Sequence, residues 1–191
     1  MTRNPSHHHQ LKAHDQQVWL LSGGAASGKS QFATEILRQV PEVVVFGTNQ
    51  IRDPLMSEKL EKLQKSRPES WQTVSVQCEL CEAIDKNPGA GILVDSINQW
   101  LASIIVSRLG KASEIELLSQ IEHEILSITQ TLEKREGPAI IVTAELGTGP
   151  SPPQKAAQLL RIALGRSNQT LASFADKVIS LQMGLPQVLK P

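Results

Sequence analysis

The residues with the clearest chemical potential form a glycine-rich segment at positions 23–30, which fits the pattern G-x-x-x-x-G-K-[ST]. Glycines let a backbone curl so that successive N–H groups point at phosphate oxygens, and a following helix adds its positive dipole end. Lys29 would reach the β- and γ-phosphates of a nucleoside triphosphate, and Ser30 would offer its hydroxyl to Mg²⁺. The segment therefore predicts a phosphate-binding loop rather than a chance glycine-rich turn. Its residues are Gly23, Gly24, Ala25, Ala26, Ser27, Gly28, Lys29 and Ser30.

Two carboxylates follow apolar runs and are the candidates to work beside this loop. Asp95 comes directly after residues 92–94, where a phosphate-loop protein usually carries an acidic residue that holds Mg²⁺. The alternative is that Asp95 caps a helix beginning near Ser96. Glu145 follows the run at residues 139–142 and could orient a substrate hydroxyl or lie solvated in a loop. The stretch at residues 147–153 is long enough for a mobile substrate loop.

The elements that must hold these residues alternate between short apolar runs and longer helical patterns. The runs are rich in β-branched residues and mostly continuous, which is typical of strands buried on both faces of a parallel sheet. We therefore expect an α/β domain with a mainly parallel sheet between helical layers. The predicted strands are residues 18–21, 43–46, 73–76, 92–94, 139–142 and 178–181, and the predicted helices are residues 29–39, 54–65, 96–108, 113–136 and 154–174.

Composition narrows the class of protein further. The chain has 191 residues, and its 19 Lys and Arg balance 19 Asp and Glu, which argues against nucleic acid as the partner. No run approaches the roughly 18 apolar residues of a membrane span. We expect a disordered polar tail over residues 1–16 and a single nucleotide-binding domain over residues 17–191. Two cysteines and an N-terminus without an apolar leader predict a cytoplasmic protein.

Two groups of residues resemble ligand sets without the residues that would complete them. Cys78 and Cys81 have a C-x-x-C spacing but no second pair and no nearby histidine. This favours two buried small residues at the start of a helix over a redox or metal site. The run His7-His8-His9 lies in the polar tail, which favours an unstructured segment over a metal site.

Further segments resemble one family, the bifunctional adenosylcobinamide kinase/adenosylcobinamide-phosphate guanylyltransferases of cobalamin synthesis. The phosphate loop with the preceding Leu20-Leu21-Ser22 looks like that family's loop, and Arg67-Pro68-Glu69-Ser70-Trp71 matches its R-P-x-x-W block. These blocks come in the family's order and cover the chain from about residue 18 to residue 190. The other matching segments are Gly47-Thr48-Asn49-Gln50-Ile51 with Asp53 and Met56, Val142-Thr143-Ala144-Glu145-Leu146-Gly147 and Gly165-Arg166-Ser167-Asn168-Gln169.

The resemblance implies a RecA-like P-loop fold, usually a homotrimer, with two activities. One phosphorylates the hydroxyl of the aminopropanol arm of adenosylcobinamide, using GTP or ATP with Mg²⁺. The other transfers GMP from GTP to that phosphate through a guanylylated histidine, with release of pyrophosphate. Lys29 and Asp95 become the catalytic candidates of this chain. Thr48 and Asn49 join the phosphate loop as nucleotide-binding candidates, and Arg67 and Glu145 become substrate-binding candidates.

The chain departs from the family at the nucleophile. The family's histidine lies five residues before the arginine of R-P-x-x-W, and here that position is Lys62. An unperturbed lysine is almost wholly protonated at neutral pH, although burial beside another cation, Lys59 or Lys65, would favour the neutral amine. The alternative is a solvated helix face on which Glu58 and Lys62 pair at i and i+4.

Two further positions also differ from the family, with Ala144 in place of an asparagine and Leu55 in place of an acidic residue. Three functions remain open at this point. The favoured one is an adenosylcobinamide kinase in which guanylyl transfer is in doubt. The alternatives are a nucleotide-binding paralogue without catalysis and a P-loop kinase of another alcohol.

Overall fold

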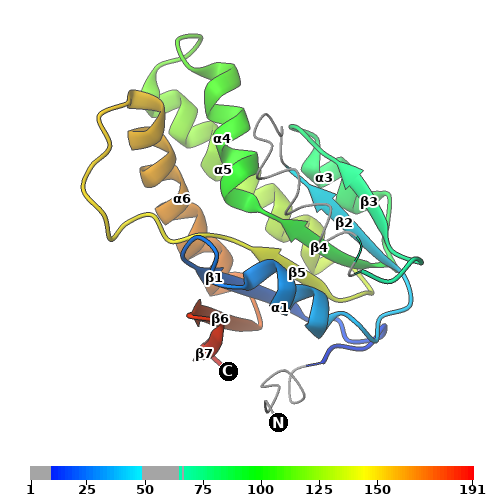
Figure 1. Cartoon of the computed structure of the whole chain (residues 1–191). Coiled ribbons are helices and arrows are strands. Elements are labelled where there is room, and N and C mark those ends of the chain that lie inside the picture. The colour runs from blue at the N-terminus through cyan, green and yellow to red at the C-terminus, as the bar shows by residue number, and fades with distance from the viewer. Residues whose placement is uncertain (1–9, 49–64, 66) are drawn as a thin grey trace.

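The centre of the molecule is a seven-stranded sheet with the order β3-β2-β4-β5-β1-β6-β7 (Figure 1). The structure is a computed structural model that describes residues 10–48, 65 and 67–191. Every neighbouring pair of strands is parallel except β6 and β7. The mainly parallel sheet predicted from the continuous apolar runs is thereby confirmed. The strands are β1 (Val18–Gly23), β2 (Val43–Gly47), β3 (Gln72–Ser75), β4 (Gly91–Asp95), β5 (Ala139–Val142), β6 (Lys177–Gln182) and β7 (Leu185–Lys190).

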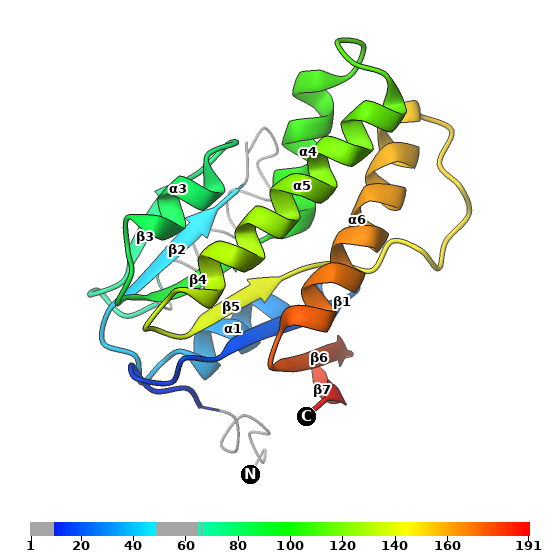
Figure 2. The ribbon, with the colours of Figure 1, turned by 180° about the vertical axis from the view of Figure 1, so that it is seen from behind.

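Helices cover both faces of the sheet, which makes three layers. Figures 1 and 2 show α4, α5 and α6 stacked on one face and α1 on the other. Alternate side chains of one strand serve the two cores: Ile92 and Val94 pack under α4, whereas Leu93 packs under α1. A strand buried on both faces needs apolar residues at every position, which explains the continuous runs. The helices are α1 (Lys29–Ile36), α3 (Leu80–Asp85), α4 (Ile97–Arg108), α5 (Glu114–Glu133) and α6 (Lys155–Phe174).

The long helix α5 begins with a reciprocal cap. The Ser113 hydroxyl accepts a hydrogen bond from the Glu116 backbone N–H at 3.3 Å, and the Glu116 carboxylate accepts one from the Ser113 backbone N–H at 2.9 Å. The Ser113 hydroxyl also donates to the Glu116 carboxylate at 2.7 Å, and this bond, together with that from the Ser113 backbone N–H, holds the pKa of Glu116 below its ordinary value. The cap fixes the start of the helix that packs against α6.

Two short elements lie outside the predicted helix and strand ranges, although a helix start was expected at the cysteine pair. The helix α3 has 6 residues, and the strand β7 forms a hairpin with β6 around Met183 and Gly184, both with positive φ. Two predicted helices end earlier than expected, because α1 stops at Ile36 and α5 at Glu133. The helix predicted over residues 54–65 lies outside the described residues, apart from Lys65.

The described end of the predicted tail is packed against the domain. Leu11 is 2% exposed, and its N–H donates a hydrogen bond to the Ile36 carbonyl at 3.0 Å. Leu11 is therefore packed against the domain, whereas the tail was expected to be disordered over residues 1–16. The histidines at positions 7–9 lie outside the described residues.

The cysteine pair lies where a helix begins, as expected, but not in the core. Cys78 is exposed just before α3, and Cys81 is half-buried within it. The expectation that both are buried is wrong for Cys78, because α3 turns only Leu80 and Ile84 fully into the core. Across the described residues, no helix is long and apolar enough to cross a membrane.

Candidate nucleotide site

The glycine-rich segment connects β1 to α1 and requires glycine at two positions. Gly28 is the residue before the first turn of α1 and has φ +93°, in the left-handed region that disfavours side chains. Gly23 has φ +148°, and a Cβ atom there would lie 2.4 Å from the Leu181 carbonyl oxygen. Ala26 also adopts a positive φ, of 56°. The chain is therefore bent tightly between the strand and the helix, as a phosphate-binding loop requires.

The ammonium group of Lys29 lies against this loop. Its Nζ donates hydrogen bonds to the carbonyl oxygens of Gly23 at 2.8 Å and Gly24 at 2.6 Å, and to the Ser27 hydroxyl at 3.4 Å. Backbone curvature thus places the cation at the N-terminus of α1, where the helix dipole also favours an anion. This arrangement can bind phosphate groups.

Asp95 is brought to the loop by the sheet. The Ser30 hydroxyl donates a hydrogen bond to Asp95 Oδ1 at 3.0 Å, although 65 positions separate the two residues. A hydroxyl and a carboxylate are the hard oxygen donors that Mg²⁺ prefers, so this pair fits the ion. No cluster of three or more His, Cys, Asp or Glu able to hold a metal occurs in the described ranges. A serine hydroxyl and one carboxylate suit Mg²⁺, which commonly takes its remaining ligands from water and substrate phosphates.

The carboxylate of Asp95 does not cap α4. The residue at the cap position is Ser96, and the side chain of Asp95 is instead directed to Ser30 and Arg67. Ser96 is itself held by Thr48 at the end of β2. Thr48 Oγ1 donates to the Ser96 carbonyl at 2.7 Å and accepts from the Ser96 N–H at 3.1 Å.

Arg67 lies beside the second oxygen of the Asp95 carboxylate. Its Nη2 lies 3.4 Å from Asp95 Oδ2, and only 5% of the Arg67 side chain is exposed. Burial lowers the pKa of Arg67, and the negative charge of Asp95 acts in the opposite direction. The candidate from the R-P-x-x-W block therefore lies beside the candidate Mg²⁺ ligand, a relationship that no local sequence pattern indicates.

Glu145 lies farther along the edge of the sheet and makes only a local bond. It is exposed, and its Oε1 accepts a hydrogen bond from the Gly147 N–H at 2.5 Å. The same loop is tied to α6, because Arg161 Nη2 donates to the Gly147 carbonyl at 2.5 Å. These contacts match a solvated loop residue, and a role on a substrate hydroxyl stays a prediction.

Sequence reasoning did not identify Asn168 as part of the strand-to-loop junction. Asn168 Nδ2 donates to the Ala144 carbonyl at 3.0 Å, and Thr143 Oγ1 donates to Asn168 Oδ1 at 2.6 Å. Asn168 thus fixes the point at which the chain leaves β5. The resemblance of residues 165–169 to the family's G-R-x-N-Q block could have identified Asn168. Two other candidates, Asn49 and Lys62, lie outside the described residues.

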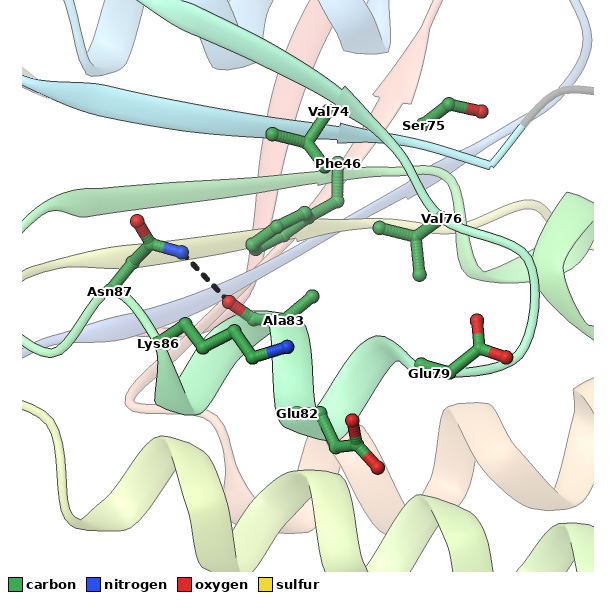
Figure 3. A pocket seen from close by; sticks show the side chains of 9 residues that line it. All are labelled: Phe46, Val74, Ser75, Val76, Glu79, Glu82, Ala83, Lys86 and Asn87. Atoms are coloured by element: carbon green, nitrogen blue, oxygen red, sulfur yellow. Dashed lines mark hydrogen bonds between the residues drawn. The ribbon is translucent and has the colours of Figure 1, made fainter.

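Two surface hollows lie away from the phosphate loop. One, of about 310 Å³, opens between β3 and α3 and has Phe46, Val74 and Val76 on one wall and Glu79 and Glu82 near its rim (Figure 3). The other, of about 570 Å³, opens between α6 and the loop near residue 147. Neither lining includes a residue of positions 23–30.

A tight loop between a central parallel strand and its helix, with an aspartate from a nearby strand at its serine, defines a P-loop nucleotide-binding protein. The family model described as cobinamide kinase / cobinamide phosphate guanyltransferase matches residues 19–189. The chain therefore belongs to that family, as its sequence blocks predict.

Two curated relatives cover nearly the same length. The bifunctional adenosylcobalamin biosynthesis protein CobU of Escherichia coli is 30% identical over 178 residues, which are 90% of this chain and 98% of that protein. The protein of the same name from Salmonella typhimurium is 29% identical over 179 residues, again 90% and 98% of the two chains.

A solved structure supports the fold alone. It is described as a prototypical ATPase from the type III secretion system of pathogenic bacteria. The similarity has a TM-score of 0.56 at 11% identity and covers 91% of this chain. This chain spans 57% of that ATPase chain. The expectation of a P-loop α/β domain is confirmed by this similarity and by the sheet.

Proposed function

We propose that the protein is a nucleoside-triphosphate-dependent kinase of adenosylcobinamide in cobalamin synthesis or salvage. The observation that carries the proposal is the hydrogen bond between Ser30 and Asp95, directly beside Lys29 on the phosphate loop. These three side chains supply the cation and the oxygen donors that phosphoryl transfer uses. Family membership supports the choice of a cobinamide as the acceptor.

In the proposed reaction, the hydroxyl oxygen of the aminopropanol arm attacks the γ-phosphorus. A new P–O bond forms, the bond to the β-phosphate oxygen breaks, the hydroxyl proton passes to water, and a nucleoside diphosphate leaves. Lys29 and the backbone N–H groups of residues 23–28 hold the phosphates and stabilise their developing charge. Ser30 and Asp95 would hold Mg²⁺, which neutralises charge on the β- and γ-phosphates when it is bound. Glu145 is the proposed group that orients the acceptor hydroxyl.

The second activity of the family is proposed to be absent or weak in this chain. Lys62 stands at the position of the guanylylated histidine, and a protonated lysine has no free electron pair to attack the α-phosphate of GTP. We expect no stable covalent nucleotide on the chain. This same departure favours the second candidate function, a nucleotide-binding paralogue without catalysis. The intact residues 28–30 and Asp95 favour the kinase.

Calorimetric titration with GTP, ATP and adenosylcobinamide, followed by a product assay, tests the kinase proposal. We expect binding of at least one triphosphate and formation of adenosylcobinamide phosphate. Triphosphate binding without any product would favour the catalytically inactive paralogue. Product formation with a different alcohol, and none with adenosylcobinamide, would favour the third function.

Peptide mass spectrometry after incubation with GTP tests the absence of the covalent intermediate. Phosphoramidates on histidine and lysine are both acid-labile, so the adduct must be located by its peptide. GMP found on Lys62, and lost in Lys62→Ala together with guanylyl transfer, would restore the bifunctional assignment. An adduct that appears only in Lys62→His would mean that the site has lost the nucleophile alone.

The assembly is proposed to be a homo-oligomer, with a trimer as the state implied by the family resemblance. Light scattering coupled to size-exclusion chromatography measures its mass directly. A mass near three chains would support the trimer, and a mass near one chain would contradict it.

A further inference from the structure

Arg67 is a buried cation for which a single long contact is seen within residues 10–48, 65 and 67–191. Its side chain is 5% exposed, and a buried charge is costly unless its donors are satisfied. The contact to Asp95 runs through Nη2 alone at 3.4 Å, longer than an ordinary hydrogen bond and without the two-pronged geometry of strong arginine–carboxylate pairs. Among the described residues, Arg67 Nε has no hydrogen-bond partner. The guanidinium therefore has at least one buried donor, Nε, available for a further anion.

The turn that carries Arg67 is held by other residues. Trp71 is 8% exposed and packs in the core on the α1 side of the sheet. Its backbone N–H donates to the Pro68 carbonyl at 3.0 Å, and the Ser70 hydroxyl donates to the Pro41 carbonyl at 2.8 Å. These contacts position the turn without the guanidinium. Burial of Arg67 at this place is thus not explained by a need to anchor the backbone.

The position of Arg67 relative to the phosphate loop is set by one carboxylate. Asp95 accepts the Ser30 hydroxyl on Oδ1 and faces Arg67 on Oδ2, so the guanidinium lies across the carboxylate from the serine. Lys29 is the residue before Ser30 and lies at the loop carbonyls. A triphosphate held by the loop would thus have Lys29 at the loop and Arg67 beside the second oxygen of the carboxylate whose first oxygen contacts Ser30.

We propose that Arg67 is a second phosphate-binding cation, which contacts the γ-phosphate when a triphosphate is bound. Mg²⁺ bound at Ser30 and Asp95 would be attracted to the same carboxylate that Arg67 now contacts. Repulsion between the two cations then favours contact of the guanidinium with phosphate oxygens, which accept its fork of N–H groups well. Arg67 would touch the group that is transferred and would be a catalytic residue. This inference deepens the proposed function by assigning a side chain to the γ-phosphate.

The test compares a nucleoside diphosphate with a triphosphate that cannot be turned over. GDP and the β,γ-imido analogue of GTP are titrated calorimetrically into wild-type protein and into Arg67→Gln, with Mg²⁺ present. We expect Arg67→Gln to weaken binding of the triphosphate analogue by about tenfold or more, with GDP affinity changed less than about twofold. The matched control is Arg38→Gln, since Arg38 is an exposed arginine at the far end of α1 that pairs with Glu35.

A merely structural role would produce a different pattern. Equal loss of affinity for both nucleotides, or no loss for either, would overturn the proposal. If Arg67→Gln does not fold, Arg67→Lys takes its place, because it keeps a positive charge but lacks the fork geometry. We then expect a fall of about threefold or more in the preference for the triphosphate analogue, and an unchanged preference would overturn the proposal.

The readout separates this inference from the proposed kinase function, because neither nucleotide requires the corrinoid. Wild-type binding of the analogue that is insensitive to Arg67 would overturn the inference and leave the kinase proposal standing. Sensitivity to Arg67 without any transfer to adenosylcobinamide would support the phosphate contact and contradict the proposed acceptor. A wild-type protein that binds neither these guanine nucleotides nor ADP and the β,γ-imido analogue of ATP would overturn both.

Discussion

Thr48 and Ser96 bind each other through two hydrogen bonds that run in opposite directions. The Thr48 hydroxyl donates to the Ser96 carbonyl at 2.7 Å and accepts from the Ser96 N–H at 3.1 Å. Both residues are buried, at 3% and 7% exposure, so neither bond is replaced by water at little cost. Because Ser96 follows Asp95 directly, one threonine at the end of β2 fixes the backbone on which the candidate Mg²⁺ ligand sits.

Replacing Thr48 with valine is expected to lower both stability and activity. Valine has nearly the shape of threonine but removes the acceptor of the buried Ser96 N–H, a loss of about 1–3 kcal/mol in the free energy of unfolding. The Ser96 carbonyl still accepts hydrogen bonds from the backbone N–H groups of Gln99 and Trp100. Looser placement of Asp95 should also reduce turnover by about tenfold or more. Urea unfolding and the kinase assay measure the two effects.

The matched control is Thr73→Val, at an exposed position of β3, which should change the free energy of unfolding by less than about 0.5 kcal/mol. If Thr48→Val were as stable and active as this control, the two bonds to Ser96 would not support the site.

Replacing Lys29 with alanine is expected to abolish turnover and leave the fold intact. In the hydrogen bonds described above the ammonium contacts loop oxygens, and Lys29 is half-buried at the mouth of the loop. Its loss removes charge stabilisation at the transferred phosphate without opening a core cavity. Circular dichroism and the kinase assay check the two parts, with exposed Lys111→Ala as the control. Full activity in a folded Lys29→Ala protein would contradict the phosphate-loop assignment.

The substitution Asp95→Asn separates a metal ligand from a structural residue. The amide keeps the size of the side chain but removes the charge, so the Mg²⁺ concentration that gives half-maximal activity should rise by about tenfold. The buried guanidinium of Arg67 also loses its counter-charge, which should cost about 1–3 kcal/mol of stability. A Mg²⁺ titration identical to that of Asp85→Asn, an exposed control on α3, would refute the role of Asp95 in metal binding.

Arg135 is expected to be a structural residue, whose substitution lowers stability far more than the charge of an arginine alone would suggest. Its guanidinium donates to the carbonyl oxygens of Ile84 at 3.2 Å and Asn87 at 2.6 Å, and also to that of Ala90, so it joins the end of α3 to the turn before β4. Arg135→Leu removes the arginine donor from all three carbonyls and should cost about 2–4 kcal/mol, although the Ile84 carbonyl still accepts a hydrogen bond from the Asn87 N–H at 3.0 Å. Urea unfolding measures the loss.

Burial lowers the pKa of Arg135 to about 10, which predicts how the contribution of Arg135 to the free energy of unfolding depends on pH. Between that value and the higher pKa of the unfolded chain, the unfolded state binds more protons, so stability from this group rises with pH only above about pH 10. At lower pH the cost of Arg135→Leu should be constant. The control is Arg166→Leu, at an exposed pair with Glu122, with an expected cost below about 1 kcal/mol. Equal costs for the two variants would contradict a structural role for Arg135.

Long buried elements could be predicted from the sequence, and short or exposed ones could not. The run Val43–Phe46 is continuous because both faces of β2 are covered, so its apolar composition alone marks the strand. The helix α3 is too short to show, in the sequence, the repeat of apolar residues every 3.6 positions that indicates a helix. The strand β7 lies at the edge of the sheet and leaves Leu185 and Leu189 about 60% exposed, so it carries no buried pattern.

The site divides in the same way between local and long-range features. The phosphate loop and Asp95 are encoded in short segments, because a motif and a strand end fix them. The contact of Arg67 with Asp95 and the bonds between Thr48 and Ser96 depend on β2 lying beside β4. That neighbourhood is set by the packing of the whole sheet, which local patterns do not specify.

Transfer of the γ-phosphate to adenosylcobinamide is the measurement that tests the central claim most directly. Purified protein, Mg²⁺ and adenosylcobinamide are incubated with GTP or ATP labelled at the γ-phosphate, and the corrinoid is separated and weighed by mass spectrometry. We expect a labelled corrinoid heavier by one phosphate, and none with Lys29→Ala. Wild-type protein that binds the triphosphate but leaves adenosylcobinamide unmodified with either nucleotide would contradict the account.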